Sequence, residues 1–247
     1  MKRIVLAITF SLALLLPLTA WATIALTGTP TASTPGWGSH QTFTVTLPSG
    51  LNTTNCPGSN SCVVLIFTTD GSASSATASG YSTVINYLGW LGLHVLYKYW
   101  ASGDGNPSVT VAGAYANDWI CAAYSGISTS NVINQSGGTN YGNTSGTVQS
   151  NSIATTVTNT ELLMYYESST AQSTSPYFSS PSEGTIEAKG GGWSAGYYTA
   201  LVDYAQAASG ATGNQTIALQ ASSQWTALQL ALAPASAGGP KGIVIIP

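Results

Sequence analysis

The sequence predicts an all-β fold, an antiparallel β-sandwich of jelly-roll-like character with about a dozen short strands. Short runs of residues alternate between apolar and polar side chains with the two-residue period of a half-buried strand. Clusters of Gly, Pro and Ser separate these runs, as turns do between neighbouring strands. Only residues 81–91 also fit the apolar spacing of a helix face.

The first predicted strand spans residues 41–47. Phe43, Val45 and Leu47 fall on one face and threonines on the other, which is the pattern of a strand with one buried face. Residues 63–67 form instead a continuous apolar run, Val-Val-Leu-Ile-Phe, of strand length. Such a run is typical of a central strand whose two faces are both covered.

Alternation returns at residues 94–100, where Val95, Tyr97 and Tyr99 share one face and are expected in the core. A turn rich in Gly and Asn follows, and residues 108–112 return as a short strand. Further strands are predicted at residues 119–124, 147–157, 161–167, 197–205, 215–221 and 225–233.

Two segments are less regular. Residues 127–146 contain mostly Ser, Asn, Gly and Thr and are predicted to form a long surface loop. Residues 81–91 leave strand and helix open, because Val84, Ile85, Leu88 and Leu91 would also lie on one helical face. The glycines in and around this segment favour the extended conformation.

Residues 1–22 have the features of a signal peptide. Two basic residues precede an apolar run at residues 4–18, and Ala20 and Ala22 have the small-residue spacing of a cleavage site. The run is shorter than the roughly 20 apolar residues of a membrane-spanning helix, and Pro17 interrupts it. We therefore expect cleavage after Ala22 rather than an uncleaved anchor, a secreted or cell-surface protein, and no membrane association afterwards.

The mature chain would carry few ionisable groups. Beyond the leader there are three lysines and no arginine against eight acidic residues, which gives a formal charge of −5. Lys and Arg supply most of the affinity of proteins for nucleic acids and for anionic membranes, so we expect neither as a partner. The same scarcity removes most acid–base and phosphate-binding chemistry, and we expect a non-enzymatic protein without a cofactor.

The cysteines and histidines fit an exported protein without a metal site. Cys56 and Cys62 bracket a turn-forming segment, which predicts a local disulfide in an oxidising compartment. Cys121 is expected to be a small buried residue rather than a nucleophile. His40 and His94 are far apart and lack a helical or Cys-rich setting, so we expect no metal ligand among them.

The chain divides into three predicted parts. These are the leader at residues 1–22, a single β-sandwich domain at residues 23–233, and a Pro/Gly/Ala linker with a terminal apolar β-segment at residues 234–247. The apolar segment contains Ile243, Val244, Ile245 and Ile246. Such a strand can pair with a sheet edge, so self-association through it is an alternative to docking on its own domain.

Five segments, taken in order, resemble a loosely defined group of exported and phage-associated β-sandwich proteins found as surface, adhesive or tail-fibre modules. The segments are residues 41–50 (QTFTVTLPSG), 95–99 (VLYKY), 122–127 (AAYSGI), 208–213 (ASGATG) and 225–228 (WTAL). The resemblance implies a binding or structural role and carries no catalytic residues. Many members have a Gly-Asp dipeptide before the strand that here begins at Cys62, so the cysteine loop departs from their pattern.

One motif favours an enzyme instead. Residues 192–196 read Gly-Trp-Ser-Ala-Gly and match the G-x-S-x-G pattern in which Ser194 would be the nucleophile of a serine hydrolase. The hydrolase order requires an acid and then a histidine after the serine, and no histidine follows Ser194. Residues 187–191 are also not the apolar strand that should precede the motif. The serine hydrolase is therefore the alternative to a binding protein.

Two further sites rest on acidic residues. A glycoside hydrolase could use Glu161 with Glu167, or Glu183 with Glu187, if the carboxyl groups of a pair fold to within roughly 5 to 10 Å. Asp104 and the nearby Asn106 could supply oxygens to calcium, although Asp-Gly-Asn-Pro is first a turn sequence.

Aromatic residues give the strongest indication of a binding function. Trp100 and Trp225 fall on the strand faces opposite the apolar stripes, which predicts that they are exposed. Flat indole faces beside neutral polar side chains suit a sugar ring or a subunit contact. We therefore expect extracellular binding of a glycan or cell-surface polymer, or a structural and adhesive role, with Trp100 and Trp225 as ligand contacts.

Overall fold

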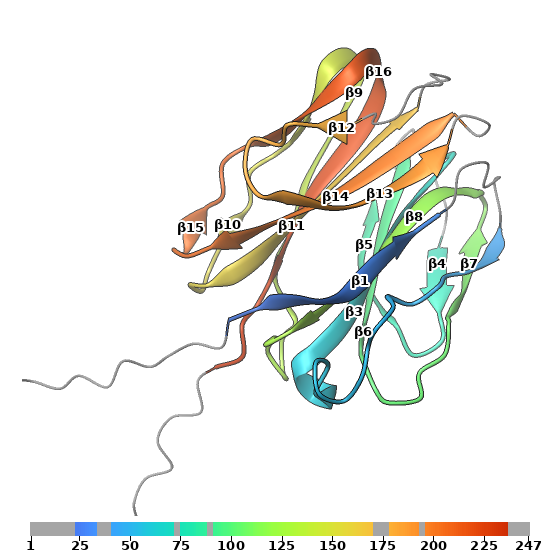
Figure 1. Ribbon diagram of the computed structural model, residues 1–247. Helices are drawn as coiled ribbons and strands as arrows, with labels where there is room; N and C mark the ends of the chain where they lie inside the picture. The colour runs from blue at the N-terminus through green and yellow to red at the C-terminus, as the bar shows by residue number, and fades with distance from the viewer. Residues whose placement is uncertain are drawn as a thin grey trace, which may run out of the picture.

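The computed structural model of the protein describes residues 23–33, 41–71, 75–87, 91–169, 178–192 and 196–236. Within these ranges the regular structure consists of sixteen strands and one short 3-10 helix, Gly58–Asn60. The predicted all-β antiparallel sandwich is confirmed (Figure 1). These ranges contain no helix long and apolar enough to cross a bilayer. The predicted leader and the segment from Ile243 to Ile246 lie outside the described residues.

A five-stranded sheet, the central sheet, lies in the middle of the fold. Its strands, in spatial order, are β1 (Ala25–Ala32), β8 (Ala116–Ser125), β3 (Ser61–Thr69), β6 (Gly92–Tyr99) and β5 (Ser82–Tyr87). Every residue of β3 is buried, which confirms the prediction of a central strand covered on both faces. The segment at residues 81–91, for which strand and helix were both open, forms strand β5, although Leu88 lies outside the described residues.

A six-stranded sheet packs on one face of the central sheet. It contains β12 (Phe178–Ser179), β16 (Gln215–Leu232), β11 (Thr160–Ser169), β14 (Tyr197–Gln206), β13 (Thr185–Gly192) and β9 (Ile133–Ser150), the last paired with β16. Val64 and Ile66 of the central sheet meet Leu163 and Leu228 of the six-stranded sheet in one buried cluster. This cluster is the core of the sandwich.

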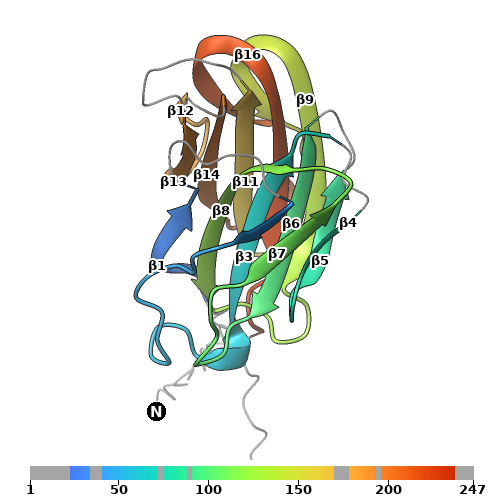
Figure 2. The same ribbon diagram turned by 90° about the vertical axis from the view of Figure 1, so that its right-hand side faces the viewer.

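A small sheet covers the other face of the central sheet (Figure 2). It consists of β2 (Thr42–Thr44), β7 (Ser108–Ala112) and β4 (Ser75–Ala78). Phe43 of β2 meets Phe67 of β3 edge to face, with ring centroids 5.5 Å apart. A separate two-stranded pair joins β10 (Ala154–Thr155) to β15 (Gly210–Ala211).

The predicted surface loop at residues 127–146 is wrong. Most of it forms β9, an 18-residue strand paired along β16 from Gln215 to Leu232. The many Gly, Ser and Asn residues hide any apolar alternation, and the backbone pairing is interrupted by several register shifts. The two strands predicted at residues 215–221 and 225–233 are likewise one continuous strand, β16.

The predicted disulfide between Cys56 and Cys62 is also wrong, because both thiols are free. Their side chains lie on opposite faces of the central sheet. Cys62 packs in the cluster between the two larger sheets, whereas Cys56 packs beneath the small sheet. Cys121 is fully buried in that second cluster, as expected of a small apolar residue.

Candidate functional site

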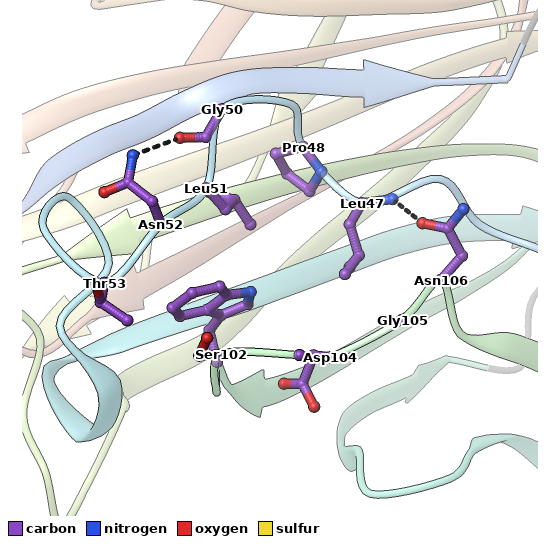
Figure 3. Close-up of a pocket in the computed structure, with 12 residues that line it drawn as sticks. Leu47, Pro48, Gly50, Leu51, Asn52, Thr53, Ser102, Asp104, Gly105 and Asn106 are labelled. Atoms are coloured by element: carbon purple, nitrogen blue, oxygen red, sulfur yellow. Dashed lines mark hydrogen bonds between the residues drawn. The ribbon is translucent and has the colours of Figure 1, made fainter.

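A cavity of about 630 Å³ opens between two loops at one end of the small-sheet layer (Figure 3). One loop follows β2 and contributes Leu47, Pro48 and residues 50–53, and the other follows β6 and contributes residues 102–106. Trp100, the residue that directly follows β6, also lines the cavity. The remaining lining groups are Leu, Pro, Gly and short polar side chains.

The first loop is held by a compact turn around Asn52. The Asn52 Oδ1 atom accepts hydrogen bonds from the backbone N–H groups of Thr54 (2.9 Å) and Asn55 (3.1 Å). Its Nδ2 atom donates to the Gly50 carbonyl at 3.3 Å, as Figure 3 shows. Gly50 itself has a φ of 81°, a conformation that favours glycine. Asn52 therefore shapes this wall of the cavity with its own amide.

The second loop is fixed by Asp104. Its Oδ1 atom accepts a hydrogen bond from Lys98 Nζ at 2.5 Å, and its Oδ2 atom accepts one from the Ala101 N–H at 2.9 Å. Partial burial pushes the pKa of Asp104 upward, but these bonds outweigh it and leave that pKa below its ordinary value. The one carboxylate of the cavity is thus paired with a cation. Both Asp104 carboxylate oxygens already accept hydrogen bonds from the protein, so this arrangement does not support the calcium site that was considered for Asp104 and Asn106.

Asn106 joins the two loops. Its Oδ1 atom accepts a hydrogen bond from the Leu47 N–H at 2.9 Å (Figure 3). Asp104 and Asn106 thus each use a side chain to fix a loop backbone, so the cavity walls are held before any ligand arrives. A pre-formed site loses less conformational entropy when it binds a ligand.

The predicted exposure of Trp100 and Trp225 is wrong, because each side chain is only 7% exposed. Trp100 packs in the cluster beneath the small sheet, and the little of it that stays accessible lines the cavity. Trp225 packs on the outer face of the six-stranded sheet, against Gly142 of the neighbouring strand β9. Alternation identified the less apolar face of each strand correctly, but the small sheet covers Trp100 and neighbouring side chains of its own cluster cover Trp225.

Sequence reasoning missed a set of buried and half-buried carboxyl groups between the two larger sheets. Glu161, Glu187 and Asp203 influence one another electrostatically at one end, and Tyr124 Oη donates to Asp203 Oδ2 at 3.4 Å. Glu167 lies at the other end, where Tyr165 Oη donates to its Oε2 atom at 3.3 Å. The sequence did contain an indication of this cluster, because these acidic residues share strand faces with core residues.

Burial dominates the electrostatics of these groups. Desolvation raises the pKa of Glu161 to about 8, and the charges of Asp203 and Glu187 add to the shift. Desolvation and then the Glu187 charge raise the pKa of Asp203 to about 7. Burial also raises the pKa values of Asp118 and Glu167 well above their ordinary range.

The predicted pairing of Glu161 with Glu167 does not form. The two residues stand near opposite ends of β11, six positions apart, which corresponds to roughly 20 Å along a strand. That separation exceeds the carboxyl spacing of either glycosidase mechanism. Glu183 is exposed before β13, whereas Glu187 lies at a register shift within β13 and interacts with Asp203.

The G-x-S-x-G motif lies between two antiparallel strands. Gly192 ends β13 and pairs with Tyr197, the first residue of β14. A nucleophile elbow joins a strand to a helix, so the flanking elements differ from those of an α/β-hydrolase. Ser194 and His40 lie outside the described residues. His94 is fully buried and stacks on Phe67 with ring centroids 5.0 Å apart.

No group of three or more His, Cys, Asp or Glu side chains in the described ranges is arranged to hold a metal ion. Comparison with known proteins found no match to the chain among family models, curated proteins or solved structures. The resemblance to exported and phage-associated sandwich modules stays a prediction.

Proposed function

We propose that the protein is a secreted, non-enzymatic β-sandwich that binds a glycan or similar cell-surface polymer in the cavity beside Trp100. The observation that carries the proposal is the chemistry of the lining. One indole, several hydroxyl and amide groups and a single carboxylate line the cavity, and Lys98 neutralises that carboxylate. Such a lining suits an uncharged polar ligand better than a phosphate or a cation.

Uncharged sugars present both hydroxyl groups and apolar C–H faces. Aromatic edges and faces can contact the apolar side, while short polar side chains exchange hydrogen bonds with the hydroxyls. Trp100 supplies the aromatic surface, and Ser102 and Thr53 supply hydroxyl groups on the two loops. The hydrogen bonds of Asn52, Asp104 and Asn106 keep these loops in place, which favours binding over reorganisation.

Gly105 offers a direct test of the cavity. It lies in the lining, it lacks the positive φ that disfavours other residues, and a Cβ atom added there would meet nothing within 4 Å. Gly105→Leu should therefore occupy the cavity without disturbing the fold. Gly146→Leu is the matched control, because Gly146 is equally unobstructed and belongs to β9.

A glycan array screened with residues 23–247 would identify the ligand, and calorimetric titration would measure its affinity for each variant. We expect Gly105→Leu to weaken binding by about tenfold or more, which corresponds to about 1.4 kcal/mol, and Gly146→Leu to leave it unchanged. Equal affinity of the two variants would show that the ligand binds elsewhere. An array without any bound glycan, repeated with cell-surface polymers, would contradict the proposal.

A structural or adhesive subunit is the second candidate. The chain leaves the sandwich beside β8, where the Ala235 N–H donates to the Gly126 carbonyl at 2.8 Å and Pro234 bridges to Ile127. The terminal segment thus begins at one end of the sandwich, from which it could reach a sheet edge of another subunit. If the protein is a structural or adhesive subunit, deletion of residues 241–247 should abolish its assembly. If it is a glycan-binding protein, the same deletion should leave its glycan affinity unchanged.

A further inference from the structure

A second, smaller cavity of about 180 Å³ lies where the described chain begins. Thr23 and Ile24 line one side of it, and Glu161 from the start of β11 lines another. Ile24 is only 5% exposed and packs in the core between the two larger sheets. The Thr23 carbonyl lies so close to Gly126 that a Cβ atom there would be 2.2 Å from it. Thr23 itself is exposed, and the buried Ile24 next to it holds the Thr23 backbone at this cavity.

Glu161 has no counterion among the residues that the structure describes. Its side chain is only 8% exposed, and no hydrogen bond or ion pair joins it to another described residue. The charged groups that act on it are Asp203 of β14 and Glu187 of β13, which are both acidic. Tyr124 of β8 completes the cluster through its hydrogen bond to Asp203.

The lysines of the described chain are used elsewhere. Lys98 pairs with Asp104, and Lys189 Nζ donates to the Phe178 carbonyl at 2.6 Å. Burying an ionised carboxylate without a counterion is costly, so these neighbouring acids either keep their protons or take a positive group at this site. The cavity beside Glu161 has room for a small one.

We propose that removal of the leader supplies this cation, because the α-ammonium group created at Thr23 enters the cavity and pairs with the Glu161 carboxylate. The inference rests on the predicted cleavage after Ala22. Hydrolysis of the Ala22–Thr23 bond consumes one water, leaves a carboxylate on Ala22 and converts the Thr23 amide nitrogen into an amine that takes up a proton. In the precursor the same nitrogen is an uncharged amide and cannot form the pair.

The ion pair makes cleavage a step in stabilising the fold. The α-ammonium lowers the cost of ionising Glu161, and the carboxylate in turn favours the protonated amine. An ordinary α-amino group has a pKa of about 7.7 to 8.0 and is partly deprotonated near neutral pH. In the mature protein that pKa should rise, because the buried acid favours the charged form.

Reactivity of the α-amine tests the proposal in the secreted protein. Mass spectrometry should first find Thr23 at the N-terminus. The rate of labelling of this amine by an acylating reagent at pH 7 is then compared for the wild type, Glu161→Gln and the control Glu183→Gln, with peptide mapping to separate the lysines. A rise of one unit in amine pKa leaves about tenfold less free amine, so we expect about tenfold slower labelling than in Glu161→Gln.

The control should label as slowly as the wild type, because Glu183 is exposed and outside the cluster. Equal labelling of wild type and Glu161→Gln, or an N-terminus other than Thr23, would overturn the proposal. If Glu161→Gln does not fold, the wild type acetylated at Thr23 replaces it. Acetylation should then lower the melting temperature at pH 7, and an unchanged melting temperature would equally overturn the pairing.

Discussion

Tyr124 of the central sheet donates a hydrogen bond from Oη to Oδ2 of Asp203 in the six-stranded sheet, at a distance of 3.4 Å. This contact crosses the sandwich core and brings a hydroxyl group to the cluster formed by Asp203, Glu161 and Glu187. The two sheets therefore meet through a polar cluster at this end, beside an otherwise apolar interface. The protonation state of the cluster should set the pH dependence of stability.

In the N-acetylated protein, which lacks the proposed counterion, the free energy of unfolding should fall as pH rises from about 5 to 8. Glu161 has a folded pKa of about 8 against an ordinary value of 4.5, so the folded protein holds a proton that the unfolded chain has released. Stability is then fully present below pH 4.5 and is lost as pH approaches 8. Urea denaturation at several pH values measures the slope.

Glu161→Gln provides the control for that slope. The amide does not titrate, so the acetylated variant should show a flatter dependence of unfolding free energy on pH than the acetylated wild type over the same range. An N-acetylated protein should lose more stability than the mature form, since it lacks the proposed counterion. Stability that increases from pH 5 to 8 in the acetylated protein would contradict this account of Glu161.

Gly142 should tolerate no side chain. A Cβ atom at this position in β9 would lie 2.5 Å from the buried ring of Trp225, which has little room to move. We expect Gly142→Ala to destabilise the fold by about 1 to 3 kcal/mol through overpacking. Gly146→Ala is the matched change in the same strand, where nothing lies within 4 Å, and should be nearly neutral. Chemical denaturation of both variants measures the difference.

The three cysteines should react as free but protected thiols. All three are buried, and burial raises the pKa values of Cys62 and Cys121 above the ordinary thiol range. A thiol reagent should label the native protein slowly and label three groups after denaturation without a reductant. Recovery of a single thiol under those conditions would show that Cys56 and Cys62 are bonded after all.

The predicted strands hold where one or both faces carry a clear apolar pattern. The continuous run at residues 63–67 identified β3, and the alternation from Leu228 to Leu232 identified the inner face of β16. β9 was missed because its pairing with β16 depends on backbone hydrogen bonds and on neighbours supplied by tertiary structure, while its own residues are polar.

The candidate site was predictable only in part. Trp100 was singled out, but its burial beneath the loop after β2 depends on a third layer that alternation does not reveal. The carboxyl cluster depends on pairing between distant segments, since Leu163 lies opposite Asp203 and thereby places Glu161 close to it. An acid on an apolar strand face, as Glu161 beside Leu163 and Tyr165, is the sequence feature that could have indicated it.

Side-chain NMR during titration with the glycan selected on the array tests the proposed function most directly. We predict that the indole N–H signal of Trp100 and the side-chain amide signal of Asn106 shift with ligand concentration, while the indole signal of Trp225 stays in place. Shifts confined to residues outside the loops at 47–53 and 102–106, with Trp100 unaffected, would contradict the assignment of this cavity as the binding site.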